Sequence, residues 1–149
     1  MTAVVAGVIG AAFQKLKDRR DAALYEAKER WKLKTEVYPA LLAFHRQLAP
    51  RIVRTWNAHP NAKSRARAFR GVIQKLKTSE YQAAMDRSVI LLAPKTLSYL
   101  QHFEAFLDEL GEEEKYWTNE KKLKQRAGAA RRVRDLLSSR ARDDLKLRL

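Results

Sequence analysis

The residues of this sequence best suited to metal binding or proton transfer are three histidines, His45, His59 and His102. Imidazole can bind metals and exchange protons near neutral pH. No two of them have HxxxH or HExxH spacing, and no carboxylate pair joins them in a known metal motif. His45 falls on an apolar helical stripe, which predicts a satisfied core or boundary histidine. We expect His59 to be exposed in a loop and His102 to have a structural or surface role.

Other catalytic signatures are also missing. The sequence has no cysteine, which excludes disulfides, thiolate zinc sites and cysteine nucleophiles. It contains no GxxxxGK[ST] or GxGxxG loop and no nucleophile elbow. Asp143 and Asp144 lie among Arg140, Arg142, Lys146 and Arg148, which favours ion pairing on a helix surface. We therefore predict no catalytic residue, metal site or cofactor. An enzyme of unrecognised type remains an interpretation, ranked after the two binding functions given at the end of this section.

The composition predicts helices. Of 149 residues, 46% are apolar, while only five are Gly and four are Pro. That length suits one domain with a core of its own. We predict an apolar N-terminal segment over residues 1–14 and a single helical-bundle domain over 15–149.

Apolar residues recur at intervals of three and four along most of the chain, the period of an amphipathic helix. A first helix is predicted over 13–48, with Pro39 kinking or dividing it and Pro50 beginning another turn. Others follow at 62–77, 80–92 with Ser79 as N-cap, and 94–110 with Gly111 as C′ residue. The last begins between 112 and 119. The helix at 62–77 has an apolar stripe of Ala66, Phe69, Ile73 and Leu76, and the last helix has an apolar seam of Leu123, Ala127, Ala130, Val133, Leu137, Ala141 and Leu145. Short connections favour an all-α, antiparallel up-and-down bundle of four to five helices.

Residues 3–13 form an unbroken apolar run, AVVAGVIGAAF. Eleven residues are fewer than the roughly 17–25 that a spanning helix needs. No Lys or Arg precedes the run, so it is also a poor signal peptide, and we expect a cytoplasmic protein or one at the inner face of a membrane. The residues predicted to contact a membrane or partner are Val4, Val5, Gly7, Val8, Ile9, Phe13, Lys15, Lys17, Arg19 and Arg20.

Two interpretations of this run stay open. Its small residues recur every four positions, which lets helices approach closely, and the basic residues that follow suit anionic headgroups. The alternative is a helix start that packs on the protein's own bundle or on a partner subunit.

Charge is unevenly distributed along the chain. The net charge is +14, but residues 80–114 contain eight acids and two bases, a net of −6. Residues 61–79 contain six bases and no acid. Acidic and basic helices could therefore pair within the molecule or head to tail between copies. Alternatively, the basic faces bind an external polyanion, and a third interpretation is that they are simply solvated.

The basic faces predict contacts with nucleic-acid phosphates, which would be strongly salt-dependent. Trp31, Trp56 and Trp117 could stack on bases, but their helical spacing favours core packing. The candidate polyanion-binding residues are Lys63, Arg65, Arg67, Arg70, Lys75, Lys77, Lys121, Lys122, Lys124, Arg126, Arg131, Arg132 and Arg134.

These patterns predict a non-catalytic helical interaction or assembly protein. It would associate with itself or with a larger complex, or with an anionic membrane surface through its apolar N-terminus and basic flank. The alternative is a basic nucleic-acid-binding bundle.

Overall fold

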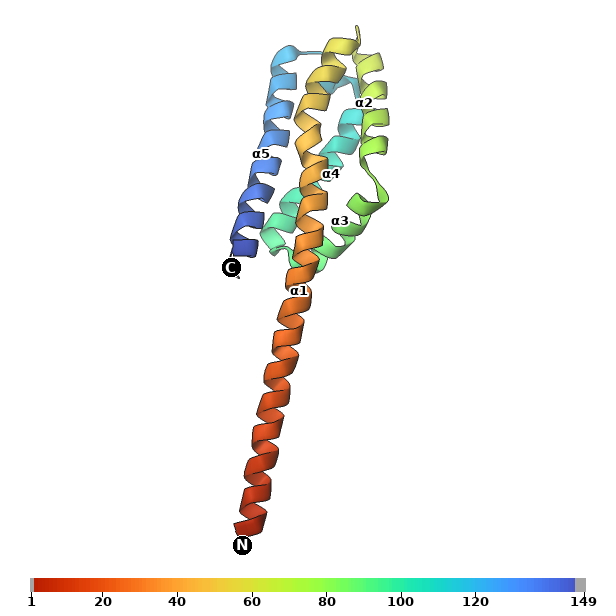
Figure 1. The fold of residues 1–149 in the computed structure, drawn as a ribbon. Coiled ribbons are helices and arrows are strands. Elements are labelled where there is room, and N and C mark those ends of the chain that lie inside the picture. The colour runs from red at the N-terminus through yellow and green to blue at the C-terminus, as the bar shows by residue number, and fades with distance from the viewer. Residues whose placement is uncertain (1, 147–149) are drawn as a thin grey trace. The chain divides into compact units, whose positions relative to one another are not determined.

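The computed structural model describes the backbone of residues 2–146 and the side chains of residues 5–145. The described chain is helical and contains no strand, which confirms the predicted all-α bundle and its long N-terminal helix (Figure 1). The elements are α1 (Thr2–Ala58), α2 (Ala62–Leu76), α3 (Ser79–Leu91), α4 (Pro94–Glu112), the short 3-10 helix η1 (Glu114–Trp117) and α5 (Glu120–Lys146).

The chain divides into two compact units, and the division falls between Leu33 and Lys34 inside α1. The first unit is a single helical stretch, and the second contains the rest of α1 and all the other helices. The boundary predicted at residues 14/15 rests on composition rather than packing, and it stays a prediction.

Helix α1 runs through both of its prolines. The sequence predicted that Pro39 would bend or divide the helix and that Pro50 would begin a new turn, but both lie inside one continuous helix. An internal proline costs about 3 kcal/mol. Burial of Val37, Tyr38 and Leu41 beside Pro39 opposes that cost, since each large apolar side chain contributes about 1.5–3 kcal/mol. The helix is not divided, and a bend at Pro39 stays a prediction.

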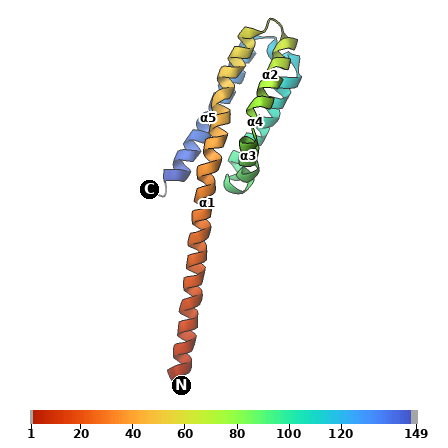
Figure 2. The ribbon, with the colours of Figure 1, turned by 45° about the vertical axis from the view of Figure 1, so that its right-hand side comes forward.

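The second unit has a continuous apolar core. The predicted stripe of α2 supplies Ala66, Phe69 and Ile73, all buried. The part of α1 after residue 34 runs antiparallel to α2 and α5, and α4 lies beside α2 (Figures 1 and 2). The predicted seam of α5 is also buried from its first member to Ala141, through Leu123, Ala127, Ala130, Val133 and Leu137.

Two predicted helix ends are wrong. Gly111 is not the residue beyond α4 but lies inside it, since the helix ends at Glu112. A Cβ atom on Gly111 would lie 3.2 Å from both Cα and Cβ of Arg70, so this glycine permits the close approach of α2 and α4. The N-cap of α3 is Thr78 rather than Ser79, because the Thr78 hydroxyl accepts a hydrogen bond from the Tyr81 amide.

The turn between α4 and α5 contains a core residue. The 3-10 helix η1 turns Trp117 into the interior, where its side chain is 1% exposed. Its indole Nε1 donates a 2.7 Å hydrogen bond to the Leu110 carbonyl, and its ring lies 5.3 Å from that of Phe69. Through these two contacts Trp117 holds the turn against Leu110 of α4 and Phe69 of α2. The predicted core position of Trp117 is confirmed.

Candidate interaction surfaces

The first candidate surface is the N-terminal arm, defined as residues 5–33 of α1. Its apolar side chains are open to solvent, with exposed fractions of 56% at Val5, 65% at Val8, 51% at Ile9 and 69% at Phe13. A Cβ atom placed on Gly7 or Gly10 would meet no other atom within 4 Å. The predicted contact residue Val4 lies outside the described side chains.

The arm continues with its basic flank. Lys15, Lys17, Arg19 and Arg20 are all exposed, and two carboxylates, Asp18 and Asp21, alternate with them. Asp18 accepts a 3.0 Å hydrogen bond from the Gln14 amide nitrogen. The structure thus places nine of the ten predicted membrane or partner residues on one exposed stretch.

Apolar exposure extends along the rest of the arm. Leu16, Leu24 and Tyr25 are each at least 60% exposed. Trp31 is 37% exposed, so its predicted core position is wrong. The described arm therefore lacks a core, although its residues follow the same three- and four-residue spacing as the buried part of α1.

Three of the six basic residues in α2 and at its C-cap have structural partners. Arg65 donates from Nε to the Trp56 and His59 carbonyls, at 3.2 and 2.9 Å, and from Nη1 to the Trp117 carbonyl, at 3.1 Å. Its guanidinium carbon lies 3.6 Å from the centre of the Trp56 ring. Arg70 donates to the Gly111 carbonyl at 3.1 Å. These arginines fasten α2 to the ends of neighbouring helices, a role that the sequence did not predict.

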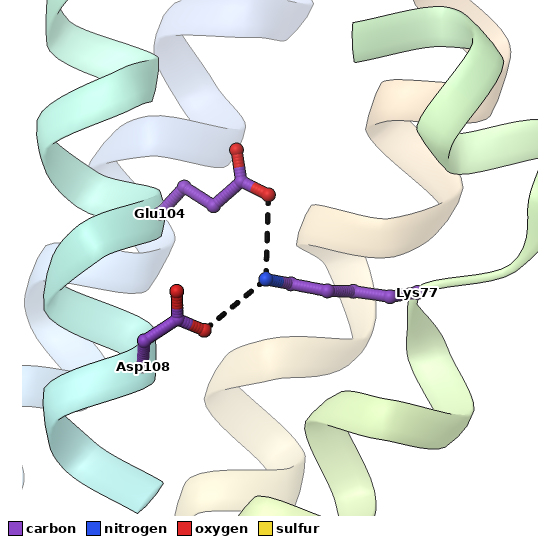
Figure 3. Close-up of polar contacts among 3 residues, drawn as sticks. All are labelled: Lys77, Glu104 and Asp108. Carbon is purple, nitrogen blue, oxygen red and sulfur yellow. Dashed lines mark hydrogen bonds and ion pairs between the residues drawn. The ribbon is translucent and has the colours of Figure 1, made fainter.

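Lys77 is the third such residue. Its ammonium nitrogen lies 3.4 Å from a Glu104 carboxylate oxygen and 3.1 Å from one of Asp108 (Figure 3). Figure 3 shows the lysine reaching from the end of α2 to both acids on α4. Of the predicted polyanion-binding residues on α2, Lys63, Arg67 and Lys75 have neither a hydrogen bond nor an ion pair in the described part of the chain.

The basic residues on α5 divide in a similar way. Arg126 lies 4.3 Å from the Tyr116 ring centre and 5.0 Å from that of Phe106. Lys124 pairs with Glu120 at 3.8 Å, and Arg134 with Asp135 at 2.8 Å. The predicted residues on α5 that are exposed and whose side chains have no partner among the described residues are Lys121, Lys122, Arg131 and Arg132.

Helices α1 and α5 flank an open groove rimmed by arginines. We call it the arginine groove, and it is lined by Ala49, Pro50, Val53, Arg54, Asn57, Ala58, Arg131 and Arg134. The lining combines apolar side chains with three guanidinium groups and contains no carboxylate. Arg131 and Arg134 are among the predicted polyanion-binding residues. Arg54 is not, because it joins them only through the packing of α1 on α5, which is distant in sequence.

The histidines are not gathered in one place. His45 is 3% exposed and lies among the rings of Phe44, Tyr81 and Phe103, which confirms its core position. Neither ring nitrogen has a hydrogen-bond partner among the described residues. The prediction that the hydrogen-bonding groups of His45 are satisfied is therefore wrong. Burial lowers the pKa of His45 to about 4.

The other two histidines lie nearer the surface. His59 lies in the loop after α1 as predicted, but it is half-buried rather than exposed. The hydrogen bond that its carbonyl accepts from Arg65 holds this loop against α2. His102 is exposed, with Nδ1 2.7 Å from the Ser98 carbonyl, which confirms its surface position. No group of three or more histidines and carboxylates in the described chain is arranged to hold a metal ion.

The sequence predicted that Asp144 would pair with basic residues on the surface of its own helix, but its contacts are with α1. It accepts a hydrogen bond from the Tyr38 hydroxyl and lies 3.8 Å from the Lys34 ammonium, so it links α5 to α1. Burial raises the pKa of Tyr38, and the hydrogen bond to Asp144 adds to that effect. The contact therefore favours a protonated tyrosine that fastens two helices together.

None of the helices in the described chain is both long and apolar enough to cross a membrane. The sequence matches no protein-family model, and comparisons with curated proteins and with solved structures give no match either.

Proposed function

We propose that this protein is a non-catalytic helical interaction protein that attaches to an anionic membrane surface through its N-terminal arm. One observation carries the proposal. From Val5 to Phe13 no side chain is polar, and every one is exposed. Nine helical residues at 3.6 per turn cover all sides of the helix. A helix that is apolar all round is suited to an environment that surrounds it, whereas one neighbouring helix would cover one side.

The length of the segment supports insertion into one leaflet. Nine residues rise about 14 Å along a helix, close to half of the roughly 30 Å hydrocarbon core. The basic flank begins two residues later, at Lys15, where a partly inserted helix would reach the headgroups. Attraction to anionic lipids contributes about 1 kcal/mol for each nearby cation, and Asp18 and Asp21 offset part of it.

Two weak signals together are the usual requirement for stable peripheral binding. The apolar segment supplies one, since a fully buried Val, Ile or Phe side chain gains about 1.5–3 kcal/mol. The basic flank supplies the second and favours the cytoplasmic face. The proposed location is therefore the inner surface of a membrane.

The proposal is tested by flotation of the full chain with vesicles of phosphatidylcholine, with and without phosphatidylserine. Val8→Asp with Ile9→Asp should abolish flotation. The matched control is Val89→Asp with Ile90→Asp, because this second Val-Ile pair on α3 is also exposed, at 58% and 76%. It should float like the unchanged protein.

Replacing Lys15, Lys17, Arg19 and Arg20 with glutamine tests the basic flank. Binding should weaken mainly on the vesicles that contain phosphatidylserine. The proposal fails if the unchanged chain does not float, or if both aspartate pairs reduce flotation equally.

Nucleic-acid binding stays the alternative prediction. Its candidate set is reduced on α2, where Arg65, Arg70 and Lys77 already bond to groups of the same chain. Retention on RNA or DNA at physiological salt, lost on replacing Lys63, Arg67 and Lys75, would favour it over the membrane role.

A further inference from the structure

The arginine groove has apolar side chains at its base and arginine side chains at its sides. Pro50 and Val53 contribute to the base, and Val53 is 37% exposed. Arg134 already bonds to Asp135 through two nitrogens, at 3.0 and 2.8 Å. Arg54 and Arg131 are exposed and have no hydrogen bond or ion pair in the described chain. The groove is thus suited to an occupant that offers carboxylates beside a modest apolar surface.

The opposite charge is concentrated at another place in the same unit. Residues 109–114 contain four Glu and no basic residue, and Lys115 follows them, so residues 109–115 have a net charge of −3. Glu109 accepts a hydrogen bond from the Tyr116 hydroxyl at 2.9 Å, and Glu113 pairs with Lys115. Glu112 and Glu114 are exposed, and neither is paired within the described residues. We call residues 109–114 the acidic end of α4.

The acidic end has the wrong charge for its position. The carboxyl end of a helix carries partial negative charge, so acids there cost about 0.3–1 kcal/mol each and cations are favoured. The last turn of α4 has no basic residue. Arg70 satisfies the Gly111 carbonyl, but no ion pair to Glu112 is found in the described chain. A cation supplied from outside would therefore stabilise this end.

We propose that the arginine groove docks the acidic end of a second copy of this chain. The two unpaired arginines complement the two unpaired glutamates, since none of these four side chains has a countercharge bonded to it within the described chain. The contact joins different surfaces of the two copies, so it is heterologous and extends head to tail. Both surfaces lie within residues 34–149, so this inference does not rest on the membrane role proposed for the arm.

Neutralising each surface separately tests the pairing in the full chain. The groove variant carries Arg54→Gln and Arg131→Gln, and the acidic-end variant carries Glu112→Gln and Glu114→Gln. A labelled groove variant is titrated with the acidic-end variant, and separately with unlabelled groove variant, at low salt. Contacts through the arm occur equally in both titrations, so the difference between them reports the proposed contact.

We expect the mixed pair to form a 1:1 complex at least about tenfold more tightly than the groove variant binds itself. Salt should abolish the difference, since the Debye length falls from about 10 Å at 0.1 M to 3 Å at 1 M. A control with Lys121→Gln and Lys122→Gln removes the same charge from exposed positions of α5 and should associate like the unchanged chain.

Equal binding in the two titrations would overturn the inference. So would a loss of association in the Lys121 and Lys122 control as large as in the groove variant. Salt-dependent binding of RNA that is lost in the groove variant, without any difference between the two titrations, would assign the groove to a polyanion instead. Flotation is measured separately, so the two proposals can fail independently.

Discussion

The buried His45 should make this protein unusually sensitive to mild acid. Its ring is 3% exposed and packed among Phe44, Tyr81 and Phe103, and neither nitrogen has a partner in the described chain. No carboxylate is positioned to stabilise an imidazolium there by a hydrogen bond among the described residues. The ring centre of one ionisable neighbour, Tyr81, lies 6.5 Å away, and the pKa of Tyr81 is raised by burial and by Glu104 and Asp108.

The expected size of the effect follows from proton linkage. Burial lowers the pKa of His45 from 6.5 to about 4. Between these values the unfolded chain binds a proton that the folded chain does not, so stability falls as pH falls. The slope is about 1.4 kcal/mol per pH unit. Over the whole window the free energy of unfolding should decrease by about 3 kcal/mol, and above pH 6.5 the histidine should contribute no pH dependence.

The comparison variant is His45→Leu, which replaces the imidazole with an apolar side chain of similar size and removes the titration. Urea unfolding of both proteins is measured between pH 7.5 and 4. Carboxylates titrate in both proteins, so their contribution cancels in the difference. The leucine variant should be at least as stable at pH 7.5, because replacing unpaired buried nitrogens with apolar atoms is neutral or favourable.

The difference in the free energy of unfolding between His45→Leu and the unchanged protein should then increase by about 3 kcal/mol between pH 7.5 and pH 4. Parallel stability curves would refute the reasoning. A ring-proton resonance assigned to His45 by its absence from His45→Leu, and titrating near pH 6.5 in the folded protein, would refute it directly, because that pKa requires solvent or a partner at the ring.

Three further predictions concern stability measured by urea unfolding. Gly111→Ala should cost about 1–3 kcal/mol, because the new Cβ would lie 3.2 Å from the backbone of α2. Gly71→Ala, whose Cβ would meet no atom within 4 Å, should stabilise helix α2 by about 0.5–1 kcal/mol, and equal effects at both glycines would contradict the close approach. Thr78→Ala should cost about 1 kcal/mol through loss of the N-cap bond, whereas Ser79→Ala should change little, and the reverse order would restore Ser79 as the cap. Lys77→Met should cost up to about 1 kcal/mol at low salt and less at 1 M salt, and a cost that does not change with salt would show that the two ion pairs contribute nothing.

Periodicity made much of the fold predictable. The stripe of α2 and the seam of α5 depend on local spacing, and both are buried as expected. Helix ends were harder, because residue preference ranks Ser above Thr as an N-cap, whereas the backbone places Thr78 rather than Ser79 at the capping position. The path of α1 through Pro50 could not be predicted either, since packing against distant helices opposes the local cost of proline.

The candidate surfaces were predictable only where they are contiguous in sequence. The exposed arm is one apolar run followed by one basic run, and both signals are local. The arginine groove needs Arg54 from α1 and Arg131 from α5, so no single segment reveals it. Likewise, sequence alone could not separate bonded cations from unbonded ones, because Arg70 and its partner Gly111 are 41 residues apart.

The basic character of α2 has a structural explanation that does not require a polyanion. Neither α1 nor α4 has a basic residue in its last turn, although the last carbonyls of a helix lack partners and attract cations. Helix α2 supplies these cations from outside. Arg65 binds the Trp56 carbonyl near the end of α1, and Arg70 binds the Gly111 carbonyl near the end of α4. Charge that satisfies other helix ends in this way is less available to an external ligand. The remaining unpaired cations lie on the arm, on α5, in the arginine groove and at Lys63, Arg67 and Lys75 of α2. These are therefore the ones that interaction experiments should address first.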